Sequence, residues 1–422
     1  MPFSPAQHLA ITCSVLLLTA ASVTSAFEVA QPEDVGMSSE RLGRLSEELK
    51  EYIDDERLAG AVVVVTRRGK LVFHEAFGER DAEAEAPMRK DAIFRIASQT
   101  KAIVSTAALI LQEEGELLIS DPVGKYLPEF METTVAVPRD GGGYDVVDAK
   151  RPITIRDLLT HTSGFDYGTG VASDRWQDAG IQGWYFADRD EPIAETVARM
   201  AKLPAEAQPG EAWVYGYNTD ILGVVVERAS GQPLDRFIEK RILRPLGMTN
   251  THFYLPPAKR DRLAVVYSAT KDGIARAPAE GSTGQGAYVD GPRESFSGGA
   301  GLLSTAEDYA RFLQMMLQGG ELDGQRILSP KTVELMTVDH LGDIAFSPGE
   351  GFGLGFYVVE DLGTRGEPGS VGEFGWGGAY HSQYWVDPAE ELVVVYMTQL
   401  IPAGDIDDAA KLRALVYQAI VD

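Results

Sequence analysis

The sequence is almost free of cysteine. Its one cysteine, Cys13, lies in the first 26 residues, which also contain no lysine, arginine, aspartate or glutamate. The apolar run over residues 11–21 is too short to cross a bilayer, and Thr24-Ser25-Ala26 has the small residues of a signal-peptidase site. We therefore predict that residues 1–26 are a signal peptide cleaved near Ala26, and that the protein is exported, either periplasmic or secreted. The mature chain would contain no cysteine, which excludes disulfides, thiol nucleophiles and cysteine-bound metals.

Other absences narrow the chemistry further. The histidines are scattered and no His-Glu-x-x-His or similar ligand spacing occurs, so we predict no metal and no cofactor. No Gly-x-Ser-x-Gly occurs, so the nucleophile elbow of α/β-hydrolases is absent. Basic residues are few, 38 against 63 acidic ones in 422 residues, and the net charge is −25. Such a surface repels nucleic acid and anionic membranes, and we expect neither as a partner.

A Ser-x-x-Lys sequence stands where an apolar segment passes into a long helical pattern. Ser98 and Lys101 begin this pattern, which contains no Gly or Pro until Gly115. Positions i and i+3 share a helix face, so the Ser98 hydroxyl and the Lys101 amine can meet. In the first helical turn the backbone N–H groups are free and the dipole is positive. This location offers a donor to an oxyanion and, with burial, favours a neutral lysine that can accept a proton.

The same spacing occurs a second time, at Ser268 and Lys271. This copy follows a strand-like segment, residues 263–267, and runs into the turn signal Asp272-Gly273. Nothing at a strand end would hold the two side chains together. We therefore interpret Ser268 as a chance occurrence and Ser98 as the candidate nucleophile.

The apolar periodicity predicts strands at both ends of the chain and helices between them. The strand-like segments are 59–66, 71–73, 353–359, 379–386 and 392–399, and the helical segments are 38–54, 153–160, 217–230, 233–243, 305–318 and 411–420. We therefore predict an α+β fold with a central antiparallel sheet from both chain ends, flanked by helices. Residues 27–95 and 290–422 would form the sheet domain, and residues 96–289 a mainly helical domain with the nucleophile helix at the interface.

Aromatic and glycine-rich segments supply the remaining candidates. Six aromatic residues between positions 164 and 192 form either a hydrophobic plug or a lid over an apolar site. Tyr215 and Tyr217 stand just before a predicted helix, and a tyrosine can carry a proton to a leaving group. Near the C terminus, Gly375-Trp376-Gly377-Gly378-Ala379 opens a strand whose glycines would let a substrate approach the backbone. Taken singly, each of these features is more often structural than catalytic.

Together, and in this order, these segments resemble the serine β-lactamase and penicillin-recognising fold in its class C branch. The likeness is greatest to the family VIII carboxylesterases and related serine hydrolases. It runs from about Val35 to Gln399. It rests on Phe94-Arg95-Ile96-Ala97-Ser98-Gln99-Thr100-Lys101 and on residues 155–164, 219–223, 245–248 and 298–302.

The resemblance implies a role for each candidate. Ser98 would be the acylated nucleophile and Lys101 the base that activates it. In the family the tyrosine stands six residues after the proline of a Pro-Gly pair, a position that Tyr215 holds here. The backbone N–H groups of Ser98 and Ala379 would be the oxyanion donors. The residues expected to bind substrate are Trp376, Gly377, Gly378 and Tyr217.

Two departures from the class C pattern favour the esterase branch. Class C enzymes carry Tyr-Ala/Ser-Asn, but here Gly216 and Tyr217 follow Tyr215, and Asn218 is displaced by one position. They also carry Lys-Thr-Gly where this chain has Trp376-Gly377-Gly378, so the lysine that would hold a β-lactam carboxylate is missing. We therefore predict a serine hydrolase that acts through an acyl-enzyme on small to medium neutral esters. The alternatives are an amide or peptide hydrolase (a D-amino-acid peptidase or weak β-lactamase), an acyltransferase, and a non-catalytic β-lactam sensor. For Trp376, simple packing under the aromatic segment is also open.

Overall fold

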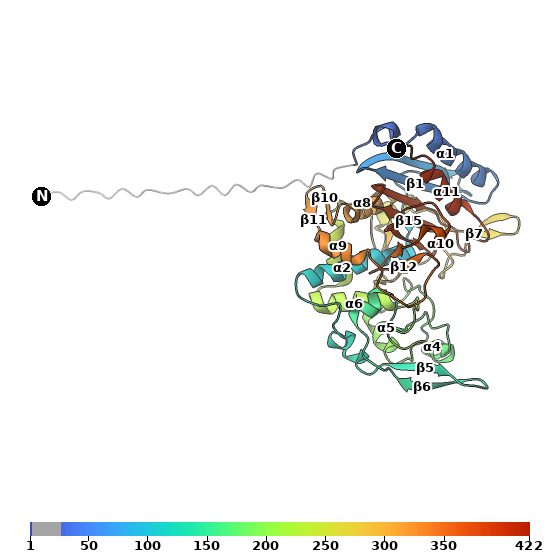
Figure 1. The fold of residues 1–422 in the computed structure, drawn as a ribbon. Coiled ribbons are helices and arrows are strands. Elements are labelled where there is room, and N and C mark those ends of the chain that lie inside the picture. Colours follow the sequence, from blue (N-terminus) through green and yellow to red (C-terminus); the bar gives the residue numbers. More distant parts are fainter. Residues whose placement is uncertain (2–26) are drawn as a thin grey trace.

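The computed structural model describes Met1 and residues 27–422, so the predicted signal peptide and its cleavage site lie outside the described residues. An eight-stranded antiparallel sheet forms the larger end of the molecule (Figure 1). Its strands, in spatial order, are β12 (Glu350–Phe352), β13 (Tyr357–Val359), β14 (Phe374–Gly378), β15 (Ser382–Asp387), β16 (Leu392–Met397), β1 (Gly60–Arg67), β2 (Lys70–Asp81) and β3 (Ala86–Pro87). Strands from the two chain ends meet where β16 pairs with β1. The predicted α+β fold with a sheet from both ends is therefore confirmed.

Strand β1 is buried on both faces because helices cover the sheet on each side. Its valines alternate between two cores: Val62 and Val64 pack in one, and Val63 and Val65 in the other. The second core also contains leucines of α1 (Ser39–Asp54) and of α11 (Asp408–Tyr417), which lie together in Figure 1. The first core contains α2 (Thr100–Glu113) and α8 (Ala306–Leu317). The sheet is thus the middle layer, and on the side of the first core α8 packs against β1 and β16 while α2 packs against α6.

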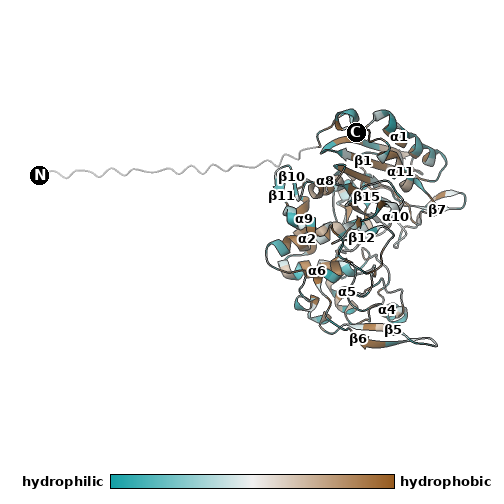
Figure 2. Ribbon diagram, viewed as in Figure 1, coloured by the Kyte–Doolittle hydropathy of each residue, from teal (hydrophilic) through white to brown (hydrophobic). Residues whose placement is uncertain are grey.

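In helix α1 the local sequence determines both where the helix begins and which face is buried. Ser38 precedes the helix, and its hydroxyl accepts a hydrogen bond from the backbone N–H of Arg41. Leu42, Leu45 and Leu49 recur at helical spacing and are buried, while the intervening charged residues face solvent. Figure 2 shows the two faces of this helix in brown and teal.

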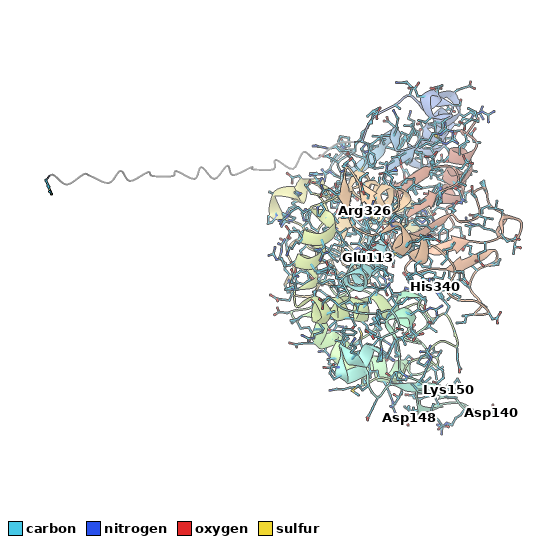
Figure 3. All side chains as sticks on the ribbon, turned by 60° about the vertical axis from the view of Figure 1, so that its left-hand side comes forward. Glu113, Asp140, Asp148, Lys150, Arg326 and His340 are labelled. Carbon is cyan, nitrogen blue, oxygen red and sulfur yellow. The ribbon has the colours of Figure 1, made fainter. Side chains whose placement is uncertain are left out.

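The end of the molecule away from the sheet is mainly helical. It contains α3 (Ile155–Leu159), α4 (Ser173–Asp178), α5 (Ile193–Met200), α6 (Asn218–Ser230) and α7 (Leu234–Ile238), which runs into a π-helical turn, Glu239–Leu243. An unpredicted hairpin of β5 (Thr134–Pro138) and β6 (Tyr144–Asp148) lies at the extreme of this end (Figure 1). Figure 3 marks the position of the hairpin by Asp140 and Asp148. The domain boundaries themselves stay a prediction.

The remaining elements are short. The strand pairs are β4 (Phe94–Arg95) with β9 (Leu303–Ser304), β7 (Tyr267–Thr270) with β8 (Gly273–Arg276) and β10 (Glu321–Leu322) with β11 (Gln325–Arg326). The helices are α9 (Pro330–Met336), α10 (Leu362–Arg365) and the 3₁₀ helices Pro32–Val35, Val123–Lys125, Pro128–Phe130 and Pro257–Arg262. Among the described residues no helix is both long and apolar enough to cross a bilayer.

Two strands are shorter in the structure than the sequence predicted. The segment 353–359 becomes a strand only at Tyr357, because Gly355, at φ +104°, turns the chain back from β12. The segment 379–386 becomes a strand only at Ser382. Its first three residues, 379–381, form the tight turn that joins β14 to β15, and this turn reaches the candidate site.

Candidate active site

Ser98 and Lys101 are in contact at the start of α2. Ser98 lies in a short 3₁₀ turn, Ala97–Gln99, that leads directly into the helix. Lys101 Nζ donates a hydrogen bond to Ser98 Oγ over 3.2 Å, and only 2% of the lysine is exposed. The residue before the serine, Ala97, has a left-handed backbone with φ +41°. Such backbone conformations are uncommon for alanine, and strained residues of this kind recur at functional sites.

Two further oxygens surround the lysine amine. Lys101 Nζ donates to the Tyr167 hydroxyl over 3.1 Å and to the Gly299 carbonyl over 2.8 Å. With Ser98 Oγ, each of the three protons of an ammonium group has one acceptor. Tyr167 was not among the residues predicted for the site, because it arrives from the aromatic segment rather than from a motif. The density of aromatic residues between 164 and 192 was the only signal for it.

A buried aspartate holds the carbonyl that faces the lysine. Asp220 Oδ1, on α6, accepts hydrogen bonds from Ser297 Oγ over 2.6 Å and from the Gly299 N–H over 3.0 Å. Burial raises the pKa of this carboxyl, which is 1% exposed. A Cβ on Gly299 would collide with the same carboxylate, so only glycine fits at this position. Asp220 therefore fixes the loop whose Gly299 carbonyl oxygen accepts a hydrogen bond from Lys101 Nζ.

Tyr215 lies beside the lysine. Lys101 Nζ is 4.6 Å from the centroid of the Tyr215 ring, and the Tyr215 hydroxyl accepts a hydrogen bond from Trp376 Nε1 over 3.1 Å. The buried His161 ring supports Tyr215 from behind, with 4.7 Å between ring centroids. Burial, together with the nearby Lys101, holds the pKa of His161 well below its usual 6.5. His161 is therefore a neutral packing partner of Tyr215.

Tyr217 occupies a different environment from Tyr215. It is fully buried, and its hydroxyl donates to the Tyr167 carbonyl over 3.1 Å. Its ring stacks on Trp176 with 5.4 Å between centroids. It does not line the cavity next to Ser98. The geometry gives Tyr217 a packing role rather than the predicted contact with substrate.

A cavity of about 570 Å³ opens beside Ser98. Its wall includes the predicted residues Tyr215, Trp376, Gly377, Gly378 and Ala379, together with Tyr167 and Trp184. A Cβ on Gly378 would lie 2.5 Å from the Ile96 carbonyl oxygen, so this glycine lets β14 pass close to the nucleophile turn. No described residue accepts a hydrogen bond from the Ala379 N–H. The Ala379 N–H is thus free to donate a hydrogen bond, and its role as an oxyanion donor, like the catalytic roles of the other residues, stays a prediction.

Trp376 both lines the cavity and packs. Its ring contacts those of Trp213, Phe346 and Phe352, with centroid distances between 5.4 and 6.4 Å. These partners come from outside the aromatic segment 164–192. That segment acts in both of the ways considered. Phe165, Trp176 and Phe186 are buried as a plug, while Tyr167 and Trp184 face the cavity.

The second Ser-x-x-Lys copy has no such arrangement. Ser268 lies in β7 and its hydroxyl donates to the Ile401 carbonyl over 2.7 Å. The Lys271 side chain is 89% exposed and lies 3.6 Å from the Asp272 carboxylate. Serine and lysine are therefore engaged separately, as expected for a strand end.

The fold and the Ser98–Lys101 pair define a serine hydrolase of the penicillin-recognising type. The model of the Beta-lactamase family matches residues 45–418, and the chain belongs to that family. Protein Rv1367c of Mycobacterium tuberculosis is 37% identical over 374 residues, which cover 86% of this chain and 91% of the relative. Esterase EstB of Burkholderia gladioli is 35% identical over 382 residues, covering 86% and 91% of the two chains. One similar solved structure is that of EstCE1, a hydrolase with promiscuous acyltransferase activity. It superposes on this chain with a TM-score of 0.77 at 28% sequence identity, and the match covers 90% of this chain and 99% of EstCE1.

Proposed function

We propose that the protein is a carboxylesterase that cleaves small to medium neutral esters through an acyl-enzyme on Ser98. The observation that carries this proposal is the 3.2 Å contact between Lys101 Nζ and Ser98 Oγ in a cavity walled by aromatic side chains. The similarity to esterase EstB supports an ester as the substrate.

In the proposed reaction Lys101 starts as the neutral amine. Ser98 Oγ attacks the ester carbonyl carbon while its proton passes to Lys101, which becomes the ammonium group that the surrounding oxygens accept from. The N–H groups of Ser98 and Ala379 would bind the carbonyl oxygen as it gains negative charge. The bond to the alcohol oxygen then breaks, and the alcohol leaves with a proton delivered through Tyr215. Water attacks the acyl-enzyme by the reverse path, the carboxylic acid leaves, and Ser98 regains its proton.

The charges around the cavity favour neutral substrates. Trp376 presents an uncharged indole next to the nucleophile. The cavity also touches Arg365 and Arg413, but both are ion-paired with the buried Glu373. A protein of net charge −25 also repels anions at long range. A β-lactam carboxylate would therefore gain little here.

Active-site labelling and kinetics test the proposal together. A fluorophosphonate should add one label per chain, on the peptide that contains Ser98, and Ser98→Ala should abolish both labelling and hydrolysis of nitrophenyl esters. Ser268→Ala is the matched control and should keep both. Sustained nitrophenol release identifies an enzyme, whereas a β-lactam sensor would give a single burst and stop. Label on Ser268, an active Ser98→Ala variant, or hydrolysis of a chromogenic cephalosporin as fast as of esters would contradict the proposal.

Acyl transfer is the second candidate, favoured by the likeness to EstCE1. The same acyl-enzyme would then be attacked by an alcohol instead of water. Adding a primary alcohol to the ester assay and measuring the ratio of new ester to free acid separates the two outcomes. A hydrolase gives mainly acid at alcohol concentrations at which a transferase gives mainly ester.

A further inference from the structure

A histidine lies where the backbone favours glycine, in the wall of the catalytic cavity. His381 is the last residue of the turn between β14 and β15, and its φ is +68°. A non-glycine residue rarely adopts this left-handed conformation, although histidine, like asparagine and aspartate, adopts it more often than other L-residues, and it costs free energy unless the surroundings hold it. His381 follows the candidate oxyanion donor Ala379 by two positions and lines the same cavity as Ser98. A left-handed residue that lines the catalytic cavity is a candidate for a functional side chain, and the contacts of His381 decide whether it is one.

A buried carboxylate fixes the orientation of the His381 ring. The ring nitrogen Nε2 lies 2.6 Å from Asp408 Oδ1, and Asp408, at the start of α11, is 1% exposed. The other oxygen of Asp408 accepts a hydrogen bond from the Tyr396 hydroxyl. A carboxylate accepts hydrogen bonds, so Nε2 carries the proton and donates it to Asp408. In the neutral ring Nδ1 is then a hydrogen-bond acceptor, and it has no partner among the described residues.

The neighbouring wall of the cavity is also polar. Ser382 Oγ, next in the chain and in the same cavity wall, is buried without a hydrogen-bond partner among the described residues. The wall of the cavity continues over Gly377 and Gly378 to Ala409 on α11. A substrate arm could therefore extend from Ser98 past the turn between β14 and β15 to His381.

The chemistry of this end of the cavity selects one kind of ligand. A hydroxyl group both donates, as Nδ1 requires, and accepts, as the proton of Ser382 Oγ allows. A carboxylate has no proton for Nδ1. The two arginines that could attract it, Arg365 and Arg413, are already ion-paired with Glu373.

We propose that His381, held by Asp408, forms a subsite that binds a hydroxyl group on the arm of the ester that reaches the turn between β14 and β15. The subsite rests on the proposed esterase function, since it acts on the same substrate. His381 would contact the substrate directly, and Asp408 would be a positioning residue that sets the tautomer and the direction of the ring. The enzyme would then prefer hydroxylated esters over their unsubstituted counterparts.

The test compares nitrophenyl hexanoate with analogues that carry one hydroxyl at successive carbons of the chain. Wild type should prefer one position over the unsubstituted ester by about tenfold in kcat/KM, because the unmatched Nδ1 is otherwise left without a partner. His381→Gly, which suits the backbone, should reduce this ratio to about one. Asp408→Asn should lower the ratio severalfold, mainly by raising KM for the hydroxylated ester. Glu391→Gly is the matched control and should keep the wild-type ratio. Glu391 also has a positive φ, +50°, but it lies in an exposed turn outside the cavity.

The two proposals fail in different ways. If wild type hydrolyses the unsubstituted ester but prefers no hydroxyl position, or if His381→Gly keeps the preference, the subsite is wrong and the esterase proposal stands. If no ester is hydrolysed, the esterase proposal is wrong. The subsite is then judged from the rate at which hexyl and hydroxyhexyl fluorophosphonates label Ser98, which needs no turnover. Equal labelling rates at every hydroxyl position would overturn it, and an accelerated rate that His381→Gly removes would support it.

Discussion

Replacing Tyr167 by phenylalanine removes one acceptor from Lys101 and little else. The lost contact is the 3.1 Å hydrogen bond from Lys101 Nζ to the tyrosine hydroxyl. The ring stays, and it packs edge-on against Tyr215 and Tyr217 with centroid distances of 5.7 and 5.2 Å. A hydrogen bond to a charged group contributes about 1.5–3 kcal/mol. Since each 1.4 kcal/mol is about a factor of ten, we expect kcat/KM for a nitrophenyl ester to fall by about 10- to 150-fold.

The pH profile separates a positioning role from a proton-transfer role for Tyr167. Burial raises the pKa of Tyr167 well above 10, so its hydroxyl stays protonated throughout the usual assay range. The Tyr167→Phe profile of kcat/KM should therefore keep the same number of ionisations as the wild-type profile, with lower activity at every pH of the assay range. Tyr215→Phe should lose more activity, about 10²- to 10⁴-fold, because it would remove the group that carries the proton.

Tyr217→Phe is the matched control for both variants. Tyr217 loses a hydroxyl of the same kind, bonded to the Tyr167 carbonyl, but lies outside the cavity wall. Its activity should fall much less. Thermal unfolding of all three variants checks that the fold is intact. A Tyr167→Phe enzyme within about twofold of wild type, or a Tyr217→Phe enzyme damaged as strongly, would refute the assignment of Tyr167 to the lysine environment.

Two further predictions concern specificity and acid stability. Trp376→Lys places a positive charge in the cavity and should reduce the ratio of kcat/KM for an ester to kcat/KM for a cephalosporin by about tenfold, or about 1.4 kcal/mol of transition-state binding. Trp376→Phe adds no charge and should leave this ratio unchanged. Although burial opposes it, hydrogen bonds from Arg151 and Thr154 lower the pKa of Asp157 below 3.8. This carboxylate therefore contributes stability above its unfolded pKa of about 3.9, and the contribution is lost as pH falls through the lower folded pKa. Urea unfolding should thus show Asp157→Asn less stable than wild type near neutral pH, with the difference shrinking below about pH 4; a constant difference would contradict the linkage.

The parts of the fold that follow a simple apolar period could be predicted from the sequence. The valine run of β1 and the leucines of α1 are examples, and both are buried as their spacing indicates. The hairpin β5–β6 was missed although its signal was present: Gly141–Gly143 separate two short runs that contain valine. Those strands leave Val137, Val146 and Val147 exposed, so they lack the one-sided alternation that marks a strand on a core.

The candidate site could be predicted only where its members lie close in sequence. Ser98 and Lys101 are three residues apart, and one helical turn brings them together. Tyr167 reaches the same lysine from 66 residues away, through a loop whose path depends on the packing of Trp176 and Phe186. No local pattern distinguishes its hydroxyl from that of Tyr217, and only the folded loop shows which of the two faces Lys101.

Backbone conformation explains why the geometry of the candidate site could not be predicted in full from the sequence. Ala97, His161 and His381 all have positive φ without being glycine. Among the nine such residues in the described chain, five lie in exposed positions, where a turn can adopt this conformation without constraint from a core. These three instead adjoin the nucleophile, the Tyr215 ring and the cavity wall. A left-handed residue costs about 1–2 kcal/mol and persists only where surrounding contacts require it. The required contacts here, such as that of His381 with Asp408 on α11, join segments far apart in the chain. The site's geometry is therefore imposed by the assembled fold.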